Sequence, residues 1–406
     1  MSQPLSERTI ALVKASVPAL ESNGVAITNR MYARMFENPM IKAMFNTAHQ
    51  TGDGSQPKAV AQAVLAYARN IDNLGALGGA VERIAQKHTA LDIRPEHYPH
   101  VGRALLAAIK DVLGVAATDE ILAAWGEAYQ FLADIFINRE KAIYAETEAA
   151  PGGWSGWRDF VVAETRQESS IIRSFILKPA DGGLVKRHRP GQYLGLLVNI
   201  PGSGEVRRNY SISSAPNEHS YRITVKREPG APAGLVSNWL HDHAKPGLHL
   251  KLAAPAGDFV LDAEKGEKVV LLSGGVGLTP MISMLETIVA EHPHLPTWFV
   301  HAAQNGSVHA MGRHVRDLAR KGDVRVSIFY AEPRDEDHIG EVYEQRGFIT
   351  EKWLAASTPV ADGIFYVCGP RPFMRAMIRA LAALGVGADR IRYEFFGPAD
   401  EILLAA

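Results

Sequence analysis

The chain has 406 residues, 47% of them hydrophobic and 21% charged, which is typical of globular proteins and long enough for two or three domains. Its 43 Lys and Arg nearly balance its 44 Asp and Glu, so with a net charge of −1 no nucleic-acid partner is expected. Cys368 is the only cysteine, which excludes an internal disulfide and fits a reducing cytosol. No apolar run spans a bilayer and the N-terminus lacks a signal-peptide core, so we expect a cytoplasmic protein without integral membrane association.

The first 150 residues show helical periodicity only. The longest helix is predicted over 118–144, with Thr118 as its N-cap. Further helices are predicted over 5–20, 25–36, 57–72, 79–91 and 97–113. Gly and Pro are sparse here and frequent afterwards, and the change falls at 151–153 (Pro-Gly-Gly). We therefore expect an all-helical first domain.

The period changes after residue 157. Strands are predicted over 159–162, 171–177 and 221–225, separated by Gly-rich turns, with one helix near 234–243. This section indicates a small antiparallel β-barrel. From residue 268 strands alternate with helices. The predicted strands are 269–272, 298–300, 324–329, 364–367 and 391–393, and the helices are 280–291, 309–321 and 372–384. Such alternation is typical of a parallel, doubly wound sheet.

Polar side chains lie on apolar helical faces of the first domain. His88 shares a face with Ile84, and Glu140, Tyr32 and Tyr98 also point inward. The alternatives are a core histidine with one satisfied hydrogen bond, a helix that has left the core by residue 140, and ordinary tyrosine packing. Together these residues suggest a metal-bearing pocket. A neutral imidazole can ligate haem iron, and a carboxylate on its other nitrogen would raise its basicity.

Three groups of residues suit cofactors in the later sections. A Gly-rich turn follows a predicted strand and opens a helix, so it can bind a pyrophosphate, although a plain turn is the alternative. Its candidates are Gly275, Val276, Gly277, Leu278, Thr279 and Pro280. Candidates for the flavin ring and phosphates are Arg208, Asn209, Tyr210, Ser211, Gly234 and Ser237. Candidates at the carboxyl edge of the sheet are Cys368, Gly369 and Pro370, with an inert buried cysteine as the alternative for Cys368.

The first domain resembles the globin domain of flavohaemoglobins, the bacterial and fungal nitric oxide dioxygenases. The resemblance covers residues 1–147 and is carried by Met31, Tyr32, Phe45, Asn46, Gln56, Lys87, His88, Tyr98, Asn138, Arg139 and Glu140. It implies that His88 is the proximal haem ligand, with Tyr98 and Glu140 as a hydrogen-bonded relay behind it.

The same resemblance implies that Tyr32 and Gln56 are distal residues and that Phe45 packs on the haem face. Pro57 is a departure, because a residue before proline is biased away from helical angles and Gln56 then lies at a cap. Val60 is smaller than the leucine expected there. The shape of the distal pocket therefore stays open.

The rest of the chain, about 155–398, resembles the ferredoxin–NADP reductase superfamily. Six motifs occur in the expected order, at 190–193, 208–211, 234–237, 275–280, 368–370 and 394–398. The resemblance implies FAD on the barrel, NAD(P)H on the sheet and Phe396 near the flavin ring. It adds the cofactor-binding candidates Tyr193, Phe395, Phe396, Gly397 and Pro398.

The two resemblances together imply a globin haem domain over 1–147, an FAD-binding barrel over 154–262 and an NAD(P)-binding domain over 267–406. The implied cofactors are haem b, FAD and NADH or NADPH. The choice of nucleotide stays open because the strand after the glycines ends at 301–303 without an acidic residue. The implied reaction converts nitric oxide and dioxygen to nitrate. The alternatives are a nitric oxide, quinone or ferric reductase, or a globin for oxygen storage or sensing.

The flavohaemoglobin resemblance also places Lys87 and Glu394 near the gap between haem and flavin. Lys87 is turned ~100° from His88 on the helix and can reach the haem rim. Glu394 ends a predicted strand beside Phe395. We expect both charges to tune electron transfer, and the alternatives are a solvated lysine and a surface carboxylate. We further expect a monomer that acts on O2 and NO without a protein partner.

Overall fold

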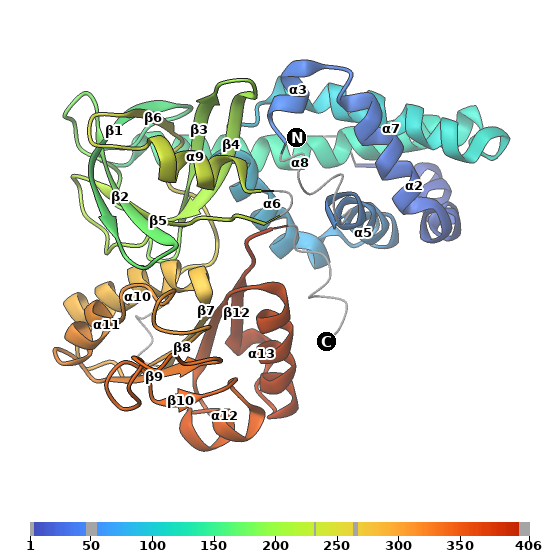
Figure 1. The fold of residues 1–406 in the computed structure, drawn as a ribbon. Coiled ribbons are helices and arrows are strands. Elements are labelled where there is room, and N and C mark those ends of the chain that lie inside the picture. Colours follow the sequence, from blue (N-terminus) through green and yellow to red (C-terminus); the bar gives the residue numbers. More distant parts are fainter. Residues whose placement is uncertain (1–3, 46–54, 231–232, 263–266, 398–406) are drawn as a thin grey trace.

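The computed structural model describes residues 4–45, 55–230, 233–262 and 267–397. Three units follow one another along the chain: a helical domain, an antiparallel barrel, and a parallel sheet covered by helices (Figure 1). The predicted fold class is confirmed.

The helical domain is built around one long helix. Its α-helices in the described residues are α1 (Glu7–Ala15), α2 (Val17–Met35), α3 (Pro39–Ala43), α5 (Ser55–Arg69), α6 (Gly78–Ala90), α7 (Tyr98–Leu113) and α8 (Asp119–Ala149). Thr118 caps α8 by accepting from the backbone N of Ile121 over 3.3 Å, as predicted, but the helix continues five residues past the predicted end at 144. This length carries α8 from the domain core to the barrel.

The prediction of one helix over 5–20 is wrong. The chain breaks at Ser16, and α1 and α2 meet there with a bend of 66°. Pro18 is the physical reason, since proline has no N–H to donate and its ring clashes with the preceding turn of a continuous helix. It fits instead in the first turn of α2.

The barrel is a six-stranded antiparallel sheet. Its elements are β1 (Arg158–Gln167), β2 (Ile172–Pro179), β3 (Tyr193–Ile200), β4 (Gly204–Ser211), β5 (Tyr221–Lys226), α9 (Leu235–His243) and β6 (His249–Leu252). The strand order is β4-β3-β6-β1-β2-β5. A bridge between Ile212 and Ile223 joins the end of β4 to β5, so the two outer strands meet and the sheet curls into a barrel.

The third unit is a six-stranded parallel sheet. Its elements are β7 (Val269–Gly274), α10 (Leu278–Glu291), β8 (Thr297–Ala303), α11 (Gly312–Ala319), β9 (Val324–Tyr330), β10 (Gln345–Arg346), α12 (Glu351–Ser357), β11 (Ile364–Cys368), α13 (Arg371–Ala383) and β12 (Ile391–Glu394). Residues of β7 alternate between the two faces. Leu271 packs with α10 and α11, and Leu272 packs with α12 and α13. Figure 1 shows these two pairs of helices beside the sheet.

Strand order fixes where a ligand can bind on this sheet. The order is β10-β9-β8-β7-β11-β12, so the chain runs outward from β7 to β10 and then returns to β11 on the other side of β7. The direction of winding therefore reverses between β7 and β11. In open parallel sheets such a switch point leaves a crevice at the carboxyl ends of the two strands.

Helix α6 joins the helical domain to the barrel (Figure 1). Ala90, at its end, packs with Tyr193 and Ala256 of the barrel. The carbonyl oxygen of Ala90 lies so close to Gly195 that a Cβ there would be 1.7 Å away. Arg207 also donates to the carbonyl of Leu91 over 2.5 Å.

In the described residues no single helix meets the length and hydropathy expected of a membrane span, although the bent pair α1 and α2 meets them when counted together.

Candidate functional site

Three polar side chains meet inside the helical domain, on α6, α8 and the start of α7. Nδ1 of His88 lies 2.7 Å from Oε1 of Glu140 and 3.0 Å from the hydroxyl of Tyr98. The Tyr98 hydroxyl donates to the same carboxylate oxygen over 2.5 Å. Both contacts of the imidazole are at Nδ1, so Nε2 has no hydrogen-bond partner among the residues that the structure describes.

Burial makes the charge of this cluster costly unless hydrogen-bond donors surround it. Glu140 is 2% exposed, which confirms the predicted inward carboxylate, and its Oε2 atom has no partner within the described part of the chain. Burial and then the Glu140 charge raise the pKa of Tyr98 far above its usual value, so the phenol stays protonated and donates. A buried carboxylate needs such donors to be tolerated.

Aromatic side chains gather in a second part of the helical domain, in a hydrophobic cluster separate from that of Tyr98. The ring centroids of Tyr32, Phe36 and Phe45 lie 5.7 Å from one another. Burial raises the pKa of Tyr32, and a hydrogen bond with the Gln56 side chain acts against that rise. The structure thus brings together Tyr32 and Gln56, which were predicted as distal, and Phe45, which was predicted to pack on the haem face.

Gln56 does not lie at a helix cap. Helix α5 begins at Ser55, so Gln56 lies in its first turn and Pro57 follows as the third helical residue. Proline is tolerated there because the first N–H groups of a helix have no intrahelical partner. The carbonyl of Pro57 accepts from the Thr28 hydroxyl over 2.9 Å, which ties the start of α5 to α2.

The Gly-rich turn lies at the switch point of the parallel sheet. Gly275 has a φ of +53°, and a Cβ there would meet nothing within 4 Å, so the turn has open space beside it. A Cβ at Gly277 would lie 2.3 Å from the carbonyl oxygen of Cys368. Glycine at this position lets the turn after β7 approach the turn after β11. The backbone then leads into α10 through Leu278, Thr279 and Pro280, which are all buried.

The second turn at the switch point is the Cys-Gly-Pro segment. Cys368 is fully buried, and burial raises the pKa of its thiol well above the usual value, which agrees with the alternative of an inert buried cysteine. Cys368 pairs in register with Ser273 of β7 and Glu394 of β12. The ends of three neighbouring strands therefore meet here, and Pro370 precedes α13 at its N-cap.

The predicted flavin residues lie on β4 and at the start of α9. Ser211 pairs with Tyr193 of β3, and Asn209 pairs with Gly195. Burial lowers the pKa of Arg208 and raises that of Tyr210. Gly234 precedes α9, which packs on β3, and the Ser237 hydroxyl donates to the Gly234 carbonyl over 3.4 Å.

Lys87 and Glu394 influence each other across the domain boundary. Glu394 is 8% exposed, so the alternative of a surface carboxylate is wrong. Burial raises the pKa of Glu394 to about 7, the nearby Lys87 ammonium opposes that rise, and Asp258 adds to it. Lys87 is half-buried, next to His88 on α6.

The terminal motif follows β12. Phe396 is 42% exposed and Phe395 lies under the guanidinium of Arg371, 5.0 Å from ring centroid to Cζ. A Cβ at Gly397 would lie 2.7 Å from the Phe395 ring. Pro398 lies outside the described residues.

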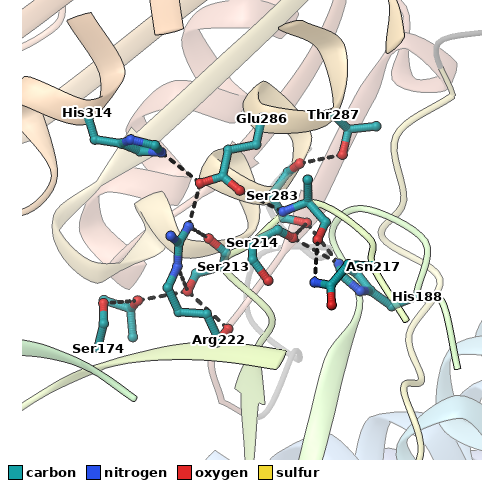
Figure 2. A network of polar contacts seen from close by, with 12 residues as sticks. Ser174, His188, Ser213, Ser214, Asn217, Arg222, Ser283, Glu286, Thr287 and His314 are labelled. Carbon is teal, nitrogen blue, oxygen red and sulfur yellow. Dashed lines mark hydrogen bonds and ion pairs between the residues drawn. The ribbon is translucent and has the colours of Figure 1, made fainter. Parts of the chain in front are cut away.

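The sequence interpretation did not identify the contacts between domains. Gln86 accepts from the backbone N of Gly257 over 3.0 Å, and Arg83 lies 3.8 Å from Asp258. A second set joins the barrel to α10 (Figure 2), where Arg222 and Glu286 are 2.6 Å apart. Glu286 is a charged residue within a largely apolar helix, which is the one signal in the sequence that could have indicated this contact. The other contacts join residues far apart in the chain, and no local pattern predicts them.

Family models match the three units in succession. The Globin model matches residues 29–136, the Oxidoreductase FAD-binding domain matches 159–261 and the Oxidoreductase NAD-binding domain matches 271–379. A flavohemoprotein of Xylella fastidiosa (strain 9a5c) is 49% identical over 406 residues, which cover 100% of both chains. A flavohemoprotein of Rhodopirellula baltica is 48% identical and covers 98% of this chain and 99% of its own.

Two solved structures are similar to the chain. The crystal structure of flavohemoglobin from Malassezia yamatoensis with bound FAD and heme has a TM-score of 0.85 and 24% identity, and covers 97% of this chain and 100% of its own. At that identity it shows a shared fold. The FAD/NAD-binding domain of nitric oxide dioxygenase from Vibrio cholerae is 39% identical, with a TM-score of 0.55, over 59% of this chain and 99% of its own.

Proposed function

Because the chain belongs to the flavohemoprotein family, we propose that it is an NAD(P)H-dependent nitric oxide dioxygenase, which removes nitric oxide by converting it with dioxygen to nitrate. The chain is an oxidoreductase that takes haem, FAD and a nicotinamide nucleotide. The observation that supports the proposal best is the cluster of His88, Glu140 and Tyr98, because its histidine lies on α6, the helix that docks on the flavin barrel. Oxygen storage requires neither this carboxylate nor a reductase.

The helical domain fits haem. Nδ1 of His88 is committed to Glu140, which leaves Nε2 as the nitrogen for iron. Oε2 of Glu140 has no hydrogen-bond partner among the described residues. No donor at that atom draws charge away from the carboxylate, which therefore accepts strongly from the imidazole N–H. A single histidine ligand suffices for haem. Among the residues that the structure describes, no group of three His, Cys, Asp or Glu side chains suits a bare metal ion.

The reductase half fits the two nucleotides. The open space at Gly275 and the close approach of Gly277 to Cys368 leave a backbone cradle before α10, suited to a pyrophosphate. On the barrel, Arg208 and Ser211 offer donors for phosphate or ribitol oxygens, and Tyr210 offers a flat face for the flavin ring. When bound, FAD splits the two electrons of a hydride into single steps, and haem supplies the redox-active iron.

Glu140 makes the imidazole more anionic by accepting its N–H, and Tyr98 holds the carboxylate in place through a second hydrogen bond. A more basic imidazole would donate more electron density to a haem iron held at Nε2, which would favour reaction of dioxygen over its reversible binding.

Tyr32, which we assign to the distal side of the haem, offers a neutral phenol beside Phe45 and within hydrogen-bond reach of Gln56. A phenol in an aromatic pocket suits the orientation of a diatomic gas by one hydrogen bond. Tyr32→Phe should raise the oxygen dissociation rate constant, and an unchanged rate constant would remove Tyr32 from this role.

Lys87 and Glu394 lie where the globin, the barrel and the end of the parallel sheet meet. We assign them to tuning of electron transfer between flavin and haem, because Glu394 is buried and feels the Lys87 charge. Lys87→Ala should slow haem reduction in anaerobic stopped-flow measurements. Glu394→Ala should do the same. A parent rate in both variants, or a change confined to the melting temperature in both, would leave both residues with a structural role only.

The proposal is tested by nitric oxide consumption of the purified holoprotein with NADH or NADPH, with and without oxygen. One electron balances each nitric oxide converted to nitrate, so a hydride supports two turnovers. We expect oxygen-dependent consumption of two nitric oxide molecules per nucleotide oxidised. Equal consumption without oxygen would indicate a nitric oxide reductase. Nucleotide oxidation with quinone or ferric acceptors alone, or no nucleotide-dependent consumption, would equally overturn the proposal.

A further inference from the structure

Helix α10, which follows the nucleotide cradle, carries a polar stripe in an otherwise apolar sequence. Ser283, Glu286 and Thr287 lie three and four residues apart, on one face of the helix. Ser283 is fully buried, and the Glu286 side chain is only 15% exposed. Polar groups in such a position need partners. Thr287 donates to the Ser283 carbonyl within the helix over 2.7 Å. Ser283 and Glu286 have partners in the flavin barrel.

Glu286 uses both carboxylate oxygens at this interface. Oε2 accepts from the backbone N of Ala215 over 2.7 Å. Oε1 accepts from Nη2 of Arg222 over 2.6 Å and lies 2.7 Å from Nε2 of His314 (Figure 2). Ala215 and Arg222 belong to the barrel, whereas His314 lies on α11 of the nucleotide domain. The carboxylate thus binds both domains at once.

The barrel side of the contact is the segment directly after the flavin candidates 208–211. Ser283 donates to the carbonyl of Ser214 over 2.7 Å, two residues before Pro216. Arg222 also donates to the carbonyl of Ser213, and the backbone N of Ser213 donates back to the Arg222 carbonyl over 2.8 Å. Figure 2 shows Arg222 between Ser213 and Glu286. The guanidinium therefore ties the segment 213–215 to α10.

The ionisation of Glu286 strengthens its contact with the barrel. Burial acts to raise the pKa of Glu286, but the hydrogen bond with His314 and the charge of Arg222 outweigh it, so the pKa lies below the usual value. The carboxylate is ionised at neutral pH. Removing it would leave the Arg222 charge and the Ala215 N–H without their partner in a poorly solvated place.

We propose that Glu286 is a positioning residue for hydride transfer, which fixes the helix behind the nucleotide cradle against the segment that follows the flavin residues. The nicotinamide and flavin rings are held by different domains. Their distance therefore depends on contacts between those domains, and a 1 Å error in the position of reacting groups can cost ~100-fold in rate. The inference concerns flavin reduction and does not depend on nitric oxide as the final substrate.

A second ion pair between α10 and the barrel provides a matched control. Glu291, near the end of α10, lies 3.4 Å from Arg187, and both side chains are about half exposed. An exposed pair of this kind contributes little. Glu291→Gln therefore removes a charge from the same helix and the same interface without affecting the buried contact.

The test uses the full-length protein loaded with haem and FAD. Flavin reduction by NADH is followed in anaerobic stopped flow for Glu286→Gln, Glu286→Ala and Glu291→Gln. For Glu286→Ala we expect the rate constant at saturating NADH to fall about tenfold or more, with a larger deuterium isotope effect from 4-deuterated NADH. Glu286→Gln keeps the shape and should show a smaller loss in the same direction. Glu291→Gln should match the parent.

Three controls separate positioning from general damage. The FAD content, the flavin reduction potential and the rate of haem reduction from photoreduced flavin should stay at parent values in the Glu286 variants. A parent rate constant in Glu286→Ala would overturn the proposal. A loss confined to NADH affinity, or a loss of bound FAD that accounts for the slower rate, would also overturn it. If the alanine variant does not fold, the same criteria apply to Glu286→Gln.

Discussion

At the residue scale, one buried carboxylate, Glu140, carries the proposed action on the imidazole of His88. It is held by two donors, the Tyr98 hydroxyl and the imidazole of His88, while its second oxygen lacks a partner within the described residues. Such an arrangement lowers the free energy of unfolding, because buried charges are costly unless they are fully paired. The cost is understandable if the carboxylate acts on the imidazole rather than on the fold.

Glu140→Gln should therefore change the bond between His88 and iron. An amide accepts a weaker hydrogen bond than a carboxylate, so we expect a lower iron–histidine stretching frequency in resonance Raman spectra. Nitric oxide dioxygenation should slow roughly 10- to 100-fold. Glu146→Gln, on the same helix with a 67% exposed side chain, is the control. An unchanged frequency in Glu140→Gln would show that the carboxylate does not act on the ligand.

Glu394 gives a pH dependence at the same scale. Its pKa is about 7 in the folded protein against an ordinary value of 4.5. Between these values the folded state holds the proton and the unfolded state has lost it. The free energy of unfolding should therefore fall as the pH rises from about 4.5 to 7, by at most roughly 3 kcal/mol, and then level off.

Glu394→Gln should remove this decrease in the free energy of unfolding between about pH 4.5 and 7. Chemical denaturation of parent and variant at several pH values measures it, with cofactor content held constant. Identical slopes for both proteins would contradict a buried carboxyl with a raised pKa.

Helix α6 is the decisive element. It carries His88, the proposed haem ligand, and Lys87 beside it. Its Gln86 bonds to the barrel backbone, and its Ala90 lies against Gly195. The part of the helical domain around His88 is thereby fixed to the barrel by one helix. Electron transfer between the two cofactors should depend on this contact.

Gly195→Ala tests the contact directly. A Cβ at this position would lie 1.7 Å from the Ala90 carbonyl oxygen, so α6 must move away from the barrel. We expect haem reduction by flavin to slow at least several-fold, while flavin reduction by NADH stays at the parent rate. Gly79→Ala, on the same helix in open space, is the control. Equal haem reduction in parent and Gly195→Ala would show that the contact is not on the electron path.

Elements with strong local signals were predictable from the sequence. The capped helix α8 and the apolar strand β7 begin where the pattern predicts. Strand β3 was not predicted, because its nearly continuous apolar sequence is buried on both sides and shows no alternation. The two-residue strand β10 has too little sequence to carry a signal.

In the candidate site, too, features that depend on local sequence were predictable and contacts between distant elements were not. Inward residues such as His88 and Glu140 follow from helical periodicity. Their contact with Tyr98, and the contact of Glu286 with Arg222, depend on the packing of distant elements. The Gln56–Pro57 pair was misread, because the structure of the first helical turn tolerates a proline that a purely local rule places at the first position.

At the scale of the whole molecule, the order of the three units along the chain is the reverse of the proposed order of electron transfer, which runs from the nucleotide domain through the barrel to the helical domain. The nucleotide cradle, the flavin strand β4 and helix α6 are consecutive neighbours in space, although they lie in the opposite order along the chain. The reductase half has its own cores, one in the barrel and two on the faces of the parallel sheet. It should therefore work without the globin.

A chain truncated to residues 154–406 should fold, bind FAD and reduce ferricyanide with NADH or NADPH. Trp154 must be kept, because it is buried in the barrel core and donates to the Leu252 carbonyl over 3.1 Å. Flavin absorbance and steady-state kinetics provide the readout. A folded truncated chain that does not bind FAD would contradict the domain division.

The origin of the oxygen atoms in the product tests the central proposal most directly. The purified holoprotein is given nitric oxide, a nicotinamide nucleotide and ¹⁸O-labelled dioxygen, and the nitrate is analysed by mass spectrometry. Dioxygenation places both atoms of one dioxygen molecule in each nitrate, so we predict doubly labelled nitrate in proportion to the nitric oxide consumed. Nitrate with one label or none, or nitrous oxide as the main product, would contradict the assignment of this protein as a nitric oxide dioxygenase.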